Sequence, residues 1–176
     1  MGIDPEKQVL VGFSGGPDSL CLLHLLHEAG FQVIAAHLDH SLRPSSAAEA
    51  EYAKSVCQAF GMECIVNRID VAAFSREHHL TQEESARVLR YEFLFEQADR
   101  LKVQAVLVAH NSDDQVETVL MHLMRGSGLS GLAGMRPVLL PNPWSNTIPL
   151  VRPLIGISRI EIENYLRDEG LDAVVD

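Results

Sequence analysis

Short apolar runs rich in β-branched residues alternate with longer amphipathic segments along the 176-residue chain. The short runs predict strands at about residues 8–13, 32–38, 63–68 and 104–109, with a weaker one near 147–151. Apolar positions three and four residues apart predict helices at about residues 18–29, 46–60, 81–101, 112–124 and 157–169. Because such alternation is typical of βαβ units, the pattern predicts an α/β fold: a Rossmann-like, open parallel five-stranded sheet with helices on both faces.

Four of the predicted helices begin with the spacing of a capping box, in which two side chains three residues apart each bond the other's backbone. The pairs are Ser46 with Glu49, Thr81 with Glu84, Ser112 with Gln115, and Ser158 with Glu161. Segment 125–149 is rich in glycine and proline instead, which predicts a long loop. Loops of this length commonly serve as lids or binding surfaces.

Composition narrows the class of protein. Hydrophobic residues make up 47% of the chain and charged residues 22%, which is typical of one globular domain over residues 1–176. The sequence lacks a signal peptide and any apolar run near the roughly 18 residues of a membrane span, so we expect a cytoplasmic protein without membrane contact. The net charge of -10 opposes long-range attraction of nucleic acid. The three cysteines form no C-x-x-C pair, which argues against zinc and iron–sulfur sites.

The segment Ser14-Gly15-Gly16-Pro17-Asp18-Ser19 lies between the first predicted strand and the first predicted helix. A glycine pair at such a turn lets successive amide N–H groups and the helix N-terminus face one anion, and the serine hydroxyls add donors. The sequence contains no Gly-Lys-Ser/Thr, so a Walker-type loop is disfavoured. The alternative is an ordinary turn in which Asp18 and Ser19 cap the helix.

Two polar segments are expected at the same edge of the sheet. HLDHSLRPSSAAE (37–49) follows the second predicted strand and AHNSDDQVETVLMHLMRG (109–126) follows the fourth, and open α/β folds place ligands where strands end. At about 100° per residue, Asp113, Asp114 and Glu117 fall on one arc near the start of their helix. Acids also favour a helix N-terminus through its dipole, which is the alternative for Asp113. The same helix carries an apolar stripe of Val116, Val119, Leu120, Leu123 and Met124.

Two readings of the first polar segment stay open on the residues alone. Imidazole and carboxylate groups suit divalent metals, so His37, Asp39 and His40 would fit the metal site of a phosphohydrolase. A loop with His40 and Arg43 in solvent is the other reading.

The sequence resembles known families over nearly its whole length. SGGPDS is similar to the SGGxDS loop of the N-type ATP pyrophosphatases, which cleave ATP to AMP and pyrophosphate while adenylating a substrate oxygen. The segments HLDHSLRPSSxxE, SARVLRYEF, AHNSDDQVET, RGSGLSGLAGM and RPLIGISRIEIENYL resemble, in order, those of the tRNA(Ile)-lysidine synthetases. The thiolating relatives that act on tRNA generally carry C-x-x-C cysteines, which this chain lacks.

The resemblance implies an adenine nucleotide alpha hydrolase-like fold and an enzyme, a ligase that joins lysine to carbon 2 of the wobble cytidine of tRNA(Ile) with a CAU anticodon. The implied cofactors are ATP and Mg²⁺, and the implied partners are tRNA(Ile) and free lysine, with a homodimer left open. The chain stops at AVVD, where family members continue, so we expect an N-terminal catalytic domain without its C-terminal tRNA-binding domains.

The resemblance also implies roles for individual residues. ATP binding is expected from Ser14, Gly15, Gly16, Asp18, Ser19, Ala35, His37 and Asp39. Asp18 is expected to hold Mg²⁺, and the alternative is that it bonds the amides of its own loop. The lysine ammonium is expected at Asp114 and Glu117, with Asp113 or His110 as base or metal partner. Arg90 meets the lysine carboxylate or a phosphate, unless it pairs with glutamates on its own helix. Contacts to ATP or tRNA are expected from His40, Arg43 and Arg125.

A two-step mechanism follows from this family. The oxygen on carbon 2 of cytosine is a poor leaving group, so transfer of AMP to that oxygen activates it while pyrophosphate leaves into the glycine loop. The neutral amine of lysine then attacks carbon 2 and expels AMP. The rival functions are a metal-dependent phosphohydrolase, a non-catalytic nucleotide-binding module, and another adenylating enzyme that modifies tRNA or transfers a different amine.

Overall fold

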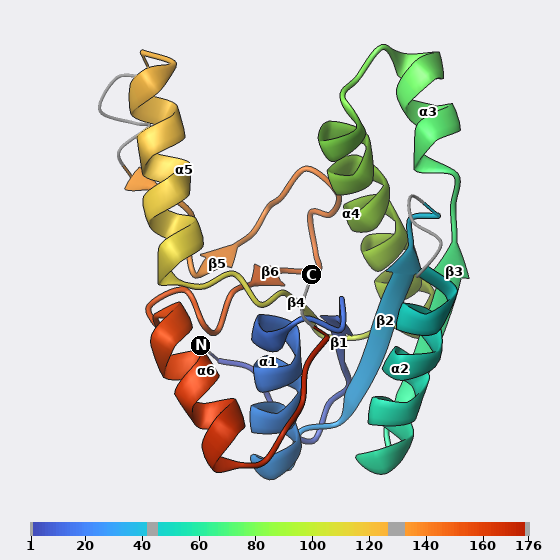
Figure 1. The fold of residues 1–176 in the computed structure, drawn as a ribbon, viewed down its shortest axis with the longest axis vertical. Helices are drawn as coiled ribbons and strands as arrows, with labels where there is room; N and C mark the ends of the chain where they lie inside the picture. Colours follow the sequence, from blue (N-terminus) through green and yellow to red (C-terminus); the bar gives the residue numbers. More distant parts are fainter. Residues whose placement is uncertain (1, 42–45, 127–132, 175–176) are drawn as a thin grey trace.

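The computed structural model describes residues 2–41, 46–126 and 133–174, with an open six-stranded sheet at its centre (Figure 1). The strands are β1 (Val9–Gly12), β2 (Val33–Asp39), β3 (Glu63–Arg68), β4 (Val106–Leu107), β5 (Val138–Leu139) and β6 (Leu150–Val151). Their order in the sheet is β3-β2-β1-β4-β6-β5, and every neighbouring pair is parallel except β5 with β6. The predicted α/β class is confirmed.

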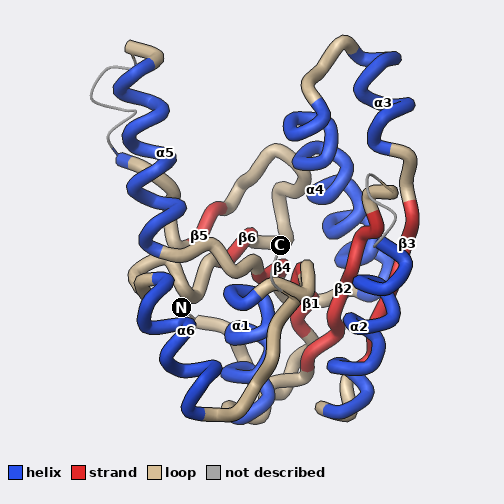
Figure 2. Tube along the Cα trace, in the orientation of Figure 1, coloured by secondary structure: helices blue, strands red, loops and turns tan. Residues whose placement is uncertain are grey.

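The predicted number of strands is wrong by one. The sixth strand, β5, comes from the segment that the sequence predicts as a loop, and it is the antiparallel edge of the sheet. Two residues are too few to show a period of two, and Val138 is 39% exposed, so β5 lacks the continuous apolar run of a buried strand. The rest of residues 133–158 is mostly loop (Figure 2).

Helices cover both faces of the sheet, as the alternating pattern predicts (Figures 1 and 2). They are α1 (Pro17–Glu28), α2 (Ser46–Ala59), α3 (Val71–His78), α4 (Gln82–Leu101), α5 (Ser112–Met124) and α6 (Arg159–Asp168). The sequence pattern missed α3, which has eight residues and a single buried one, Val71. A local cap starts this helix, because the Asp70 carboxylate accepts a hydrogen bond from Ala73 N at 2.9 Å.

Alternating strand residues divide the core into two layers. Val9 and Val11 pack with residues of α1, α2 and α6 on one face, whereas Leu10 between them packs with α4 on the other. Ala35 and Ala36 of β2 divide in the same way. Both faces of the central strands are therefore buried, which explains their nearly continuous apolar sequences.

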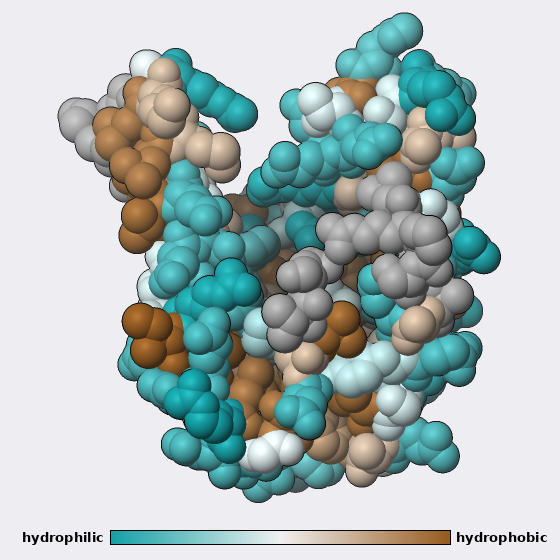
Figure 3. All heavy atoms as spheres, viewed as in Figure 1, coloured by the Kyte–Doolittle hydropathy of each residue, from teal (hydrophilic) through white to brown (hydrophobic). Residues whose placement is uncertain are grey.

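Helix α5 stands apart from both layers and has no buried residue. It projects from the carboxyl edge of the sheet, across from α3 and α4 (Figure 1). The apolar stripe expected from its sequence is largely exposed and appears as brown spheres along the helix in Figure 3. Its most exposed apolar side chains are Val116, Leu120, Met121, Leu123 and Met124. Among the described residues, no helix combines the length and apolar character needed to cross a membrane.

Two of the four expected capping boxes are confirmed, at Thr81 and Ser158. The expected box of Ser112 with Gln115 is wrong by one residue, because Asn111 is the N-cap of α5 and pairs with Asp114. Gln115 instead donates to Met135 O at 2.9 Å and accepts from Met135 N at 2.6 Å, which ties the following loop to α5. The expected partner Ser46 lies where the structure describes no side chain.

Candidate functional site

A pocket of about 370 Å³ opens at the carboxyl edge of the sheet. The ends of β1, β2 and β4 form its floor, and α4 and the start of α5 form its sides. Figure 3 shows the hollow between α5 and α4. Its apolar lining includes Phe13, Ala36, Leu38, Phe93, Leu94 and Val108. Its polar lining is Ser14, Asp18, Ser19, His40, Arg90, His110 and Asp114. An apolar wall with a few convergent polar groups is the usual composition of a small-molecule site.

The turn between β1 and α1 is held in shape by its own hydroxyl groups. Ser14 Oγ and Ser19 Oγ lie 3.1 Å apart, Ser19 Oγ donates to Gly16 O at 3.0 Å, and Ser14 N donates to Ser19 Oγ at 3.3 Å. Gly15 has a φ of +91°, a conformation that a side chain would strain. These hydrogen bonds and the conformation of Gly15 fix the shape of the turn.

The N-terminus of α1 has the features of an anion-binding site. Its N-cap is Gly16, and no side chain bonds to the first amides of the helix. The sequence-based alternative, in which Asp18 and Ser19 cap this helix, is therefore wrong. Uncapped N–H groups at a helix start carry the positive end of the helix dipole and bind phosphate groups well.

Asp18 faces the pocket from the second residue of α1. Its Oδ1 accepts a hydrogen bond from Asn111 Nδ2 at 3.1 Å. Burial raises the pKa of this carboxyl, the hydrogen bond from Asn111 and the charge of Arg159 lower it, and the charges of Asp114 and Asp113 raise it again. The net shift is upward.

Asn111 is a site residue that the sequence reasoning missed. It is 2% exposed and bonds the turn of α1 through Asp18 and the start of α5 through its side-chain oxygen, which accepts from Asp113 N at 2.9 Å and Asp114 N at 3.0 Å. Asp114 Oδ2 accepts from Asn111 N at 2.9 Å in return. The signal was present, since asparagine is a preferred N-cap residue and precedes an acid by three positions.

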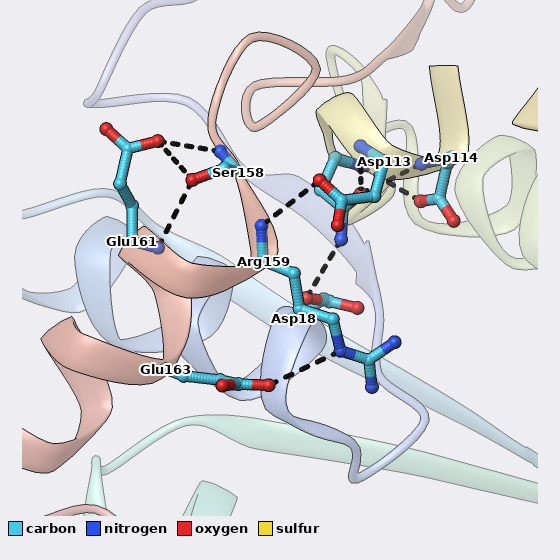
Figure 4. Close-up of polar contacts among 8 residues, drawn as sticks. Asp18, Asp113, Asp114, Ser158, Arg159, Glu161 and Glu163 are labelled. Atoms are coloured by element: carbon cyan, nitrogen blue, oxygen red, sulfur yellow. Dashed lines mark hydrogen bonds and ion pairs between the residues drawn. The ribbon is translucent and has the colours of Figure 1, made fainter. Parts of the chain in front are cut away.

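The three acids of α5 point in different directions. Only Asp114 lines the pocket. Asp113 Oδ1 accepts from Ser112 Oγ at 3.2 Å and from Arg159 N at 3.4 Å, so it faces the start of α6 (Figure 4). Glu117 is exposed one turn further along the helix and does not line the pocket.

His37 and Asp39 of β2 are buried beside the pocket rather than in its lining. His37 is 4% exposed, and its Nδ1 donates to Phe13 O at 2.9 Å, which ties β2 to the end of β1. Asp39 Oδ1 accepts from Ser41 N at 2.7 Å, and its Oδ2 lies 3.4 Å from Arg68 Nε. Both side chains thus order the ends of strands.

Other residues expected from the sequence lie at varied places. Ala35 is fully buried on the far face of β2, and its neighbour Ala36 reaches the pocket. Arg43 lies outside the described residues. Arg125 is exposed at the C-terminal end of α5, roughly 17 Å along the helix from Asp114 in the pocket at about 1.5 Å per residue. Within the described part of the chain, no three His, Cys, Asp or Glu side chains could hold a metal ion, so the metal site considered at residues 37–40 is absent there.

Two pocket side chains carry buried polar atoms without a partner. These atoms are His40 Nδ1 and Arg90 Nε. The pairing of Arg90 with glutamates on its own helix is not found among the described residues. Burial, the charge of Arg90 and the charge of His37 lower the pKa of His40. A buried donor or acceptor left unpaired costs about 1–3 kcal/mol, so a polar ligand in this pocket would recover stabilisation.

His110 lies at the end of β4 and lines the pocket. Its Nδ1 accepts a hydrogen bond from Arg152 Nε at 3.2 Å. Burial lowers the pKa of His110 to about 3, and the charges of Arg152, Arg90 and Arg87 act in the same direction. The imidazole is therefore neutral at physiological pH.

The low pKa of His110 predicts how stability changes with pH. Below its ordinary value of 6.5 the unfolded chain takes up a proton at this position and the folded chain does not until about pH 3, so the free energy of unfolding falls across that window as the pH is lowered. Urea unfolding at a series of pH values measures this loss. His110→Gln, which cannot titrate, is expected to flatten the dependence, and parallel curves for the two proteins would contradict the expectation.

Comparisons with known proteins identify the family of the chain. The family model described as a PP-loop domain matches residues 2–176. The chain is 41% identical over 175 residues to a protein of Dehalococcoides mccartyi named tRNA(Ile)-lysidine synthase, covering 96% of this chain and 37% of that protein. It is 46% identical over 168 residues to one of the same name from Geobacillus kaustophilus, covering 93% of this chain and 35% of that one. The chain thus spans little more than a third of the length of these curated relatives.

Solved structures share the fold at lower sequence identity. The U34-tRNA thiolase NcsA of Methanococcus maripaludis superposes with a TM-score of 0.79 at 20% identity, covering 97% of this chain and 60% of that one. The NH3-dependent NAD synthetase of Campylobacter jejuni gives a TM-score of 0.63 at 19% identity, covering 96% and 66%. These two similarities concern the fold alone, whereas the family model spans the pocket and nearly the whole sequence. The chain belongs to the PP-loop domain family.

Proposed function

We propose that the chain is the catalytic part of a tRNA(Ile)-lysidine synthase, which uses ATP to join lysine to carbon 2 of the wobble cytidine of tRNA(Ile). The observation that carries this proposal is one pocket that combines an anion-binding turn with a carboxylate. Ser14 and Ser19 lie on one side and Asp114 at the start of α5. The names of the relatives, at 36–46% identity, support the choice of substrates.

The turn between β1 and α1 is proposed to receive the pyrophosphate of ATP. The N-terminus of α1 has no side-chain cap, and Ser14 and Ser19 line the pocket beside it. The apolar lining, which includes Leu38, Phe93 and Val108, offers a surface for the adenine ring. Ala36 also lines the pocket, and we propose that backbone groups near it bond the edge of the ring.

Magnesium fits the carboxylate oxygens present. Mg²⁺ is usually held in proteins by one or two carboxylates together with substrate phosphates, rather than by a complete protein cage. Asp18 lines the pocket from the second residue of α1, the helix whose N-terminus is proposed to receive the phosphates. When bound there, the ion would neutralise charge that develops as pyrophosphate leaves.

Asp114 is proposed to bind the ammonium group of lysine, and Glu117 to extend the same negative field outward along α5. Arg90 is proposed to bind an anionic group of the substrates, because its Nε is buried without a partner in the pocket lining. The chain itself carries a net charge of -10, so we assign the main grip on tRNA to domains outside these 176 residues.

The test combines protein, ATP, labelled lysine and a tRNA(Ile) transcript, and measures AMP, pyrophosphate and lysine joined to the transcript. The proposal requires all three products in equal amounts. Phosphate release without AMP would indicate a phosphohydrolase, and AMP formation that depends on another amine would indicate a different adenylating enzyme. Calorimetric titration of lysine into the ATP-loaded protein tests the lysine site without any need for tRNA.

A further inference from the structure

Arg152 is a buried cation at the start of RPLIGISRIEIENYL, a segment for which the sequence predicted no role. It follows β6 directly, is 5% exposed, and donates through Nη1 to Arg136 O at 2.9 Å, while its backbone N donates to Pro137 O at 2.8 Å. No carboxylate in the described part of the chain pairs with it. Arg152 does not line the pocket, so its guanidinium acts there through the residue that it contacts, His110.

The contact between these two residues determines which imidazole nitrogen carries the proton. Arginine has only donors, so His110 Nδ1 must be the acceptor in the 3.2 Å bond from Arg152 Nε. A neutral imidazole has one N–H, which is then at Nε2. Nε2 makes no hydrogen bond to any described residue, and His110 lines the pocket.

The position of His110 in the sheet brings it beside the phosphate-binding turn. Val11 of β1 and Leu107 of β4 are partners in the parallel ladder. Three residues further along each chain lie Ser14 and His110, and both line the pocket. An N–H donor at this place faces the same region as the serine hydroxyls.

We propose that Arg152 is a positioning residue that holds His110 as its Nε2–H tautomer, so that His110 donates a hydrogen bond to a phosphoryl oxygen of the bound nucleotide. This inference rests on the proposed use of ATP. It excludes the two roles that the sequence left open for His110, because Nδ1 is occupied by a donor and a protonated Nε2 neither accepts a proton nor binds a metal. A neutral donor also keeps its proton in place throughout the reaction.

Nitrogen NMR of protein labelled with ¹⁵N-histidine tests the tautomer directly, with the His110 signals assigned by their loss in His110→Gln. The wild-type protein is expected to show a protonated Nε2 and an unprotonated Nδ1. Arg152→Met, which keeps a long side chain but no donor, should shift protonation toward Nδ1, whereas Arg152→Lys should preserve the wild-type pattern. An unprotonated Nε2 in the wild-type protein would overturn the proposal even if Arg152→Met fails to fold.

Titration with separate ligands tests the acceptor. A non-hydrolysable ATP analogue and inorganic pyrophosphate are each expected to shift the Nε2–H signal, and adenosine or lysine alone to leave it in place. A shift with adenosine or lysine and none with pyrophosphate would overturn the phosphoryl assignment. These measurements need no turnover, so they separate failure of this inference from failure of the lysine ligation.

The activities of two His110 variants distinguish a hydrogen-bond donor from a general base at this position. Glutamine places an amide N–H near the position of Nε2, so His110→Gln is expected to retain ATP-dependent activity within about tenfold, whereas His110→Ala is expected to lose about 100-fold or more. Equal loss in both variants would contradict the donor role.

Discussion

Asp114→Asn is expected to raise the dissociation constant for lysine about 100-fold while changing that for ATP by less than about threefold. Asp114 is the acid of α5 that lines the pocket, and a charged hydrogen bond to an ammonium is worth about 1.5–3 kcal/mol. The amide oxygen of asparagine can still accept from Asn111 N, as Asp114 Oδ2 does at 2.9 Å, so the cap of α5 is kept. Calorimetric titration of lysine and of an ATP analogue measures the two constants.

The neighbouring acid provides a matched control. Asp113 has the same charge and lies one residue nearer the helix start, but its carboxylate faces Ser112 and Arg159 instead of the pocket. Asp113→Asn is therefore expected to change the dissociation constant for lysine by less than about twofold, because a solvent-screened charge without direct contact has a small effect. Equal losses at both positions would show that the negative field of the helix start, rather than a direct contact, attracts lysine.

Much of the fold was predictable because its determinants are local. The β1 strand, the glycine turn and α1 follow one another within twenty residues, and each is specified by its own composition. Two glycines and two serines predict a turn that binds phosphate, and the structure shows that the helix after this turn has no side-chain cap. The missed elements, α3 and β5, have eight and two residues, so each offers few positions over which a period can be recognised.

The arrangement of the site was less predictable because it depends on contacts distant in sequence. Asn111 and Asp18 are 93 residues apart, and Arg152 and His110 are 42 apart. The helical period places Asp113 and Asp114 about 100° apart, but it does not say which of them faces the pocket. That choice follows from the docking of α5 against the start of α6, where Arg159 N meets Asp113.

The exposed stripe of α5 shows a limit of periodicity as a guide to burial. The spacing of Val116, Leu120 and Leu123 predicts an amphipathic helix correctly, yet these side chains are 58%, 52% and 51% exposed. A hydrophobic period states that a helix has an apolar face. It does not state that the face packs against the same domain.

Asp18→Asn is expected to reduce magnesium-dependent use of ATP by about 100-fold or more without loss of folding. The amide oxygen of asparagine can still accept the 3.1 Å hydrogen bond from Asn111 Nδ2, so the link between α1 and α5 is retained and only the charge is removed. ATP consumption across a magnesium titration measures the effect. If the variant keeps the magnesium dependence of the wild-type protein, Asp18 serves the geometry of the turn instead of the ion.

Asn111→Asp tests the same carboxylate in another way, because it keeps Asp18 and changes the residue that donates a hydrogen bond to it. The new carboxylate still accepts from the first amides of α5, but it replaces a donor with a negative charge beside Asp18. Burial already raises the pKa of Asp18, and a neighbouring carboxylate raises it further. Since magnesium binds the ionised form, the low-pH limit of ATP use should move to higher pH in this variant, and an unchanged limit would show that the ionisation of Asp18 does not control the reaction.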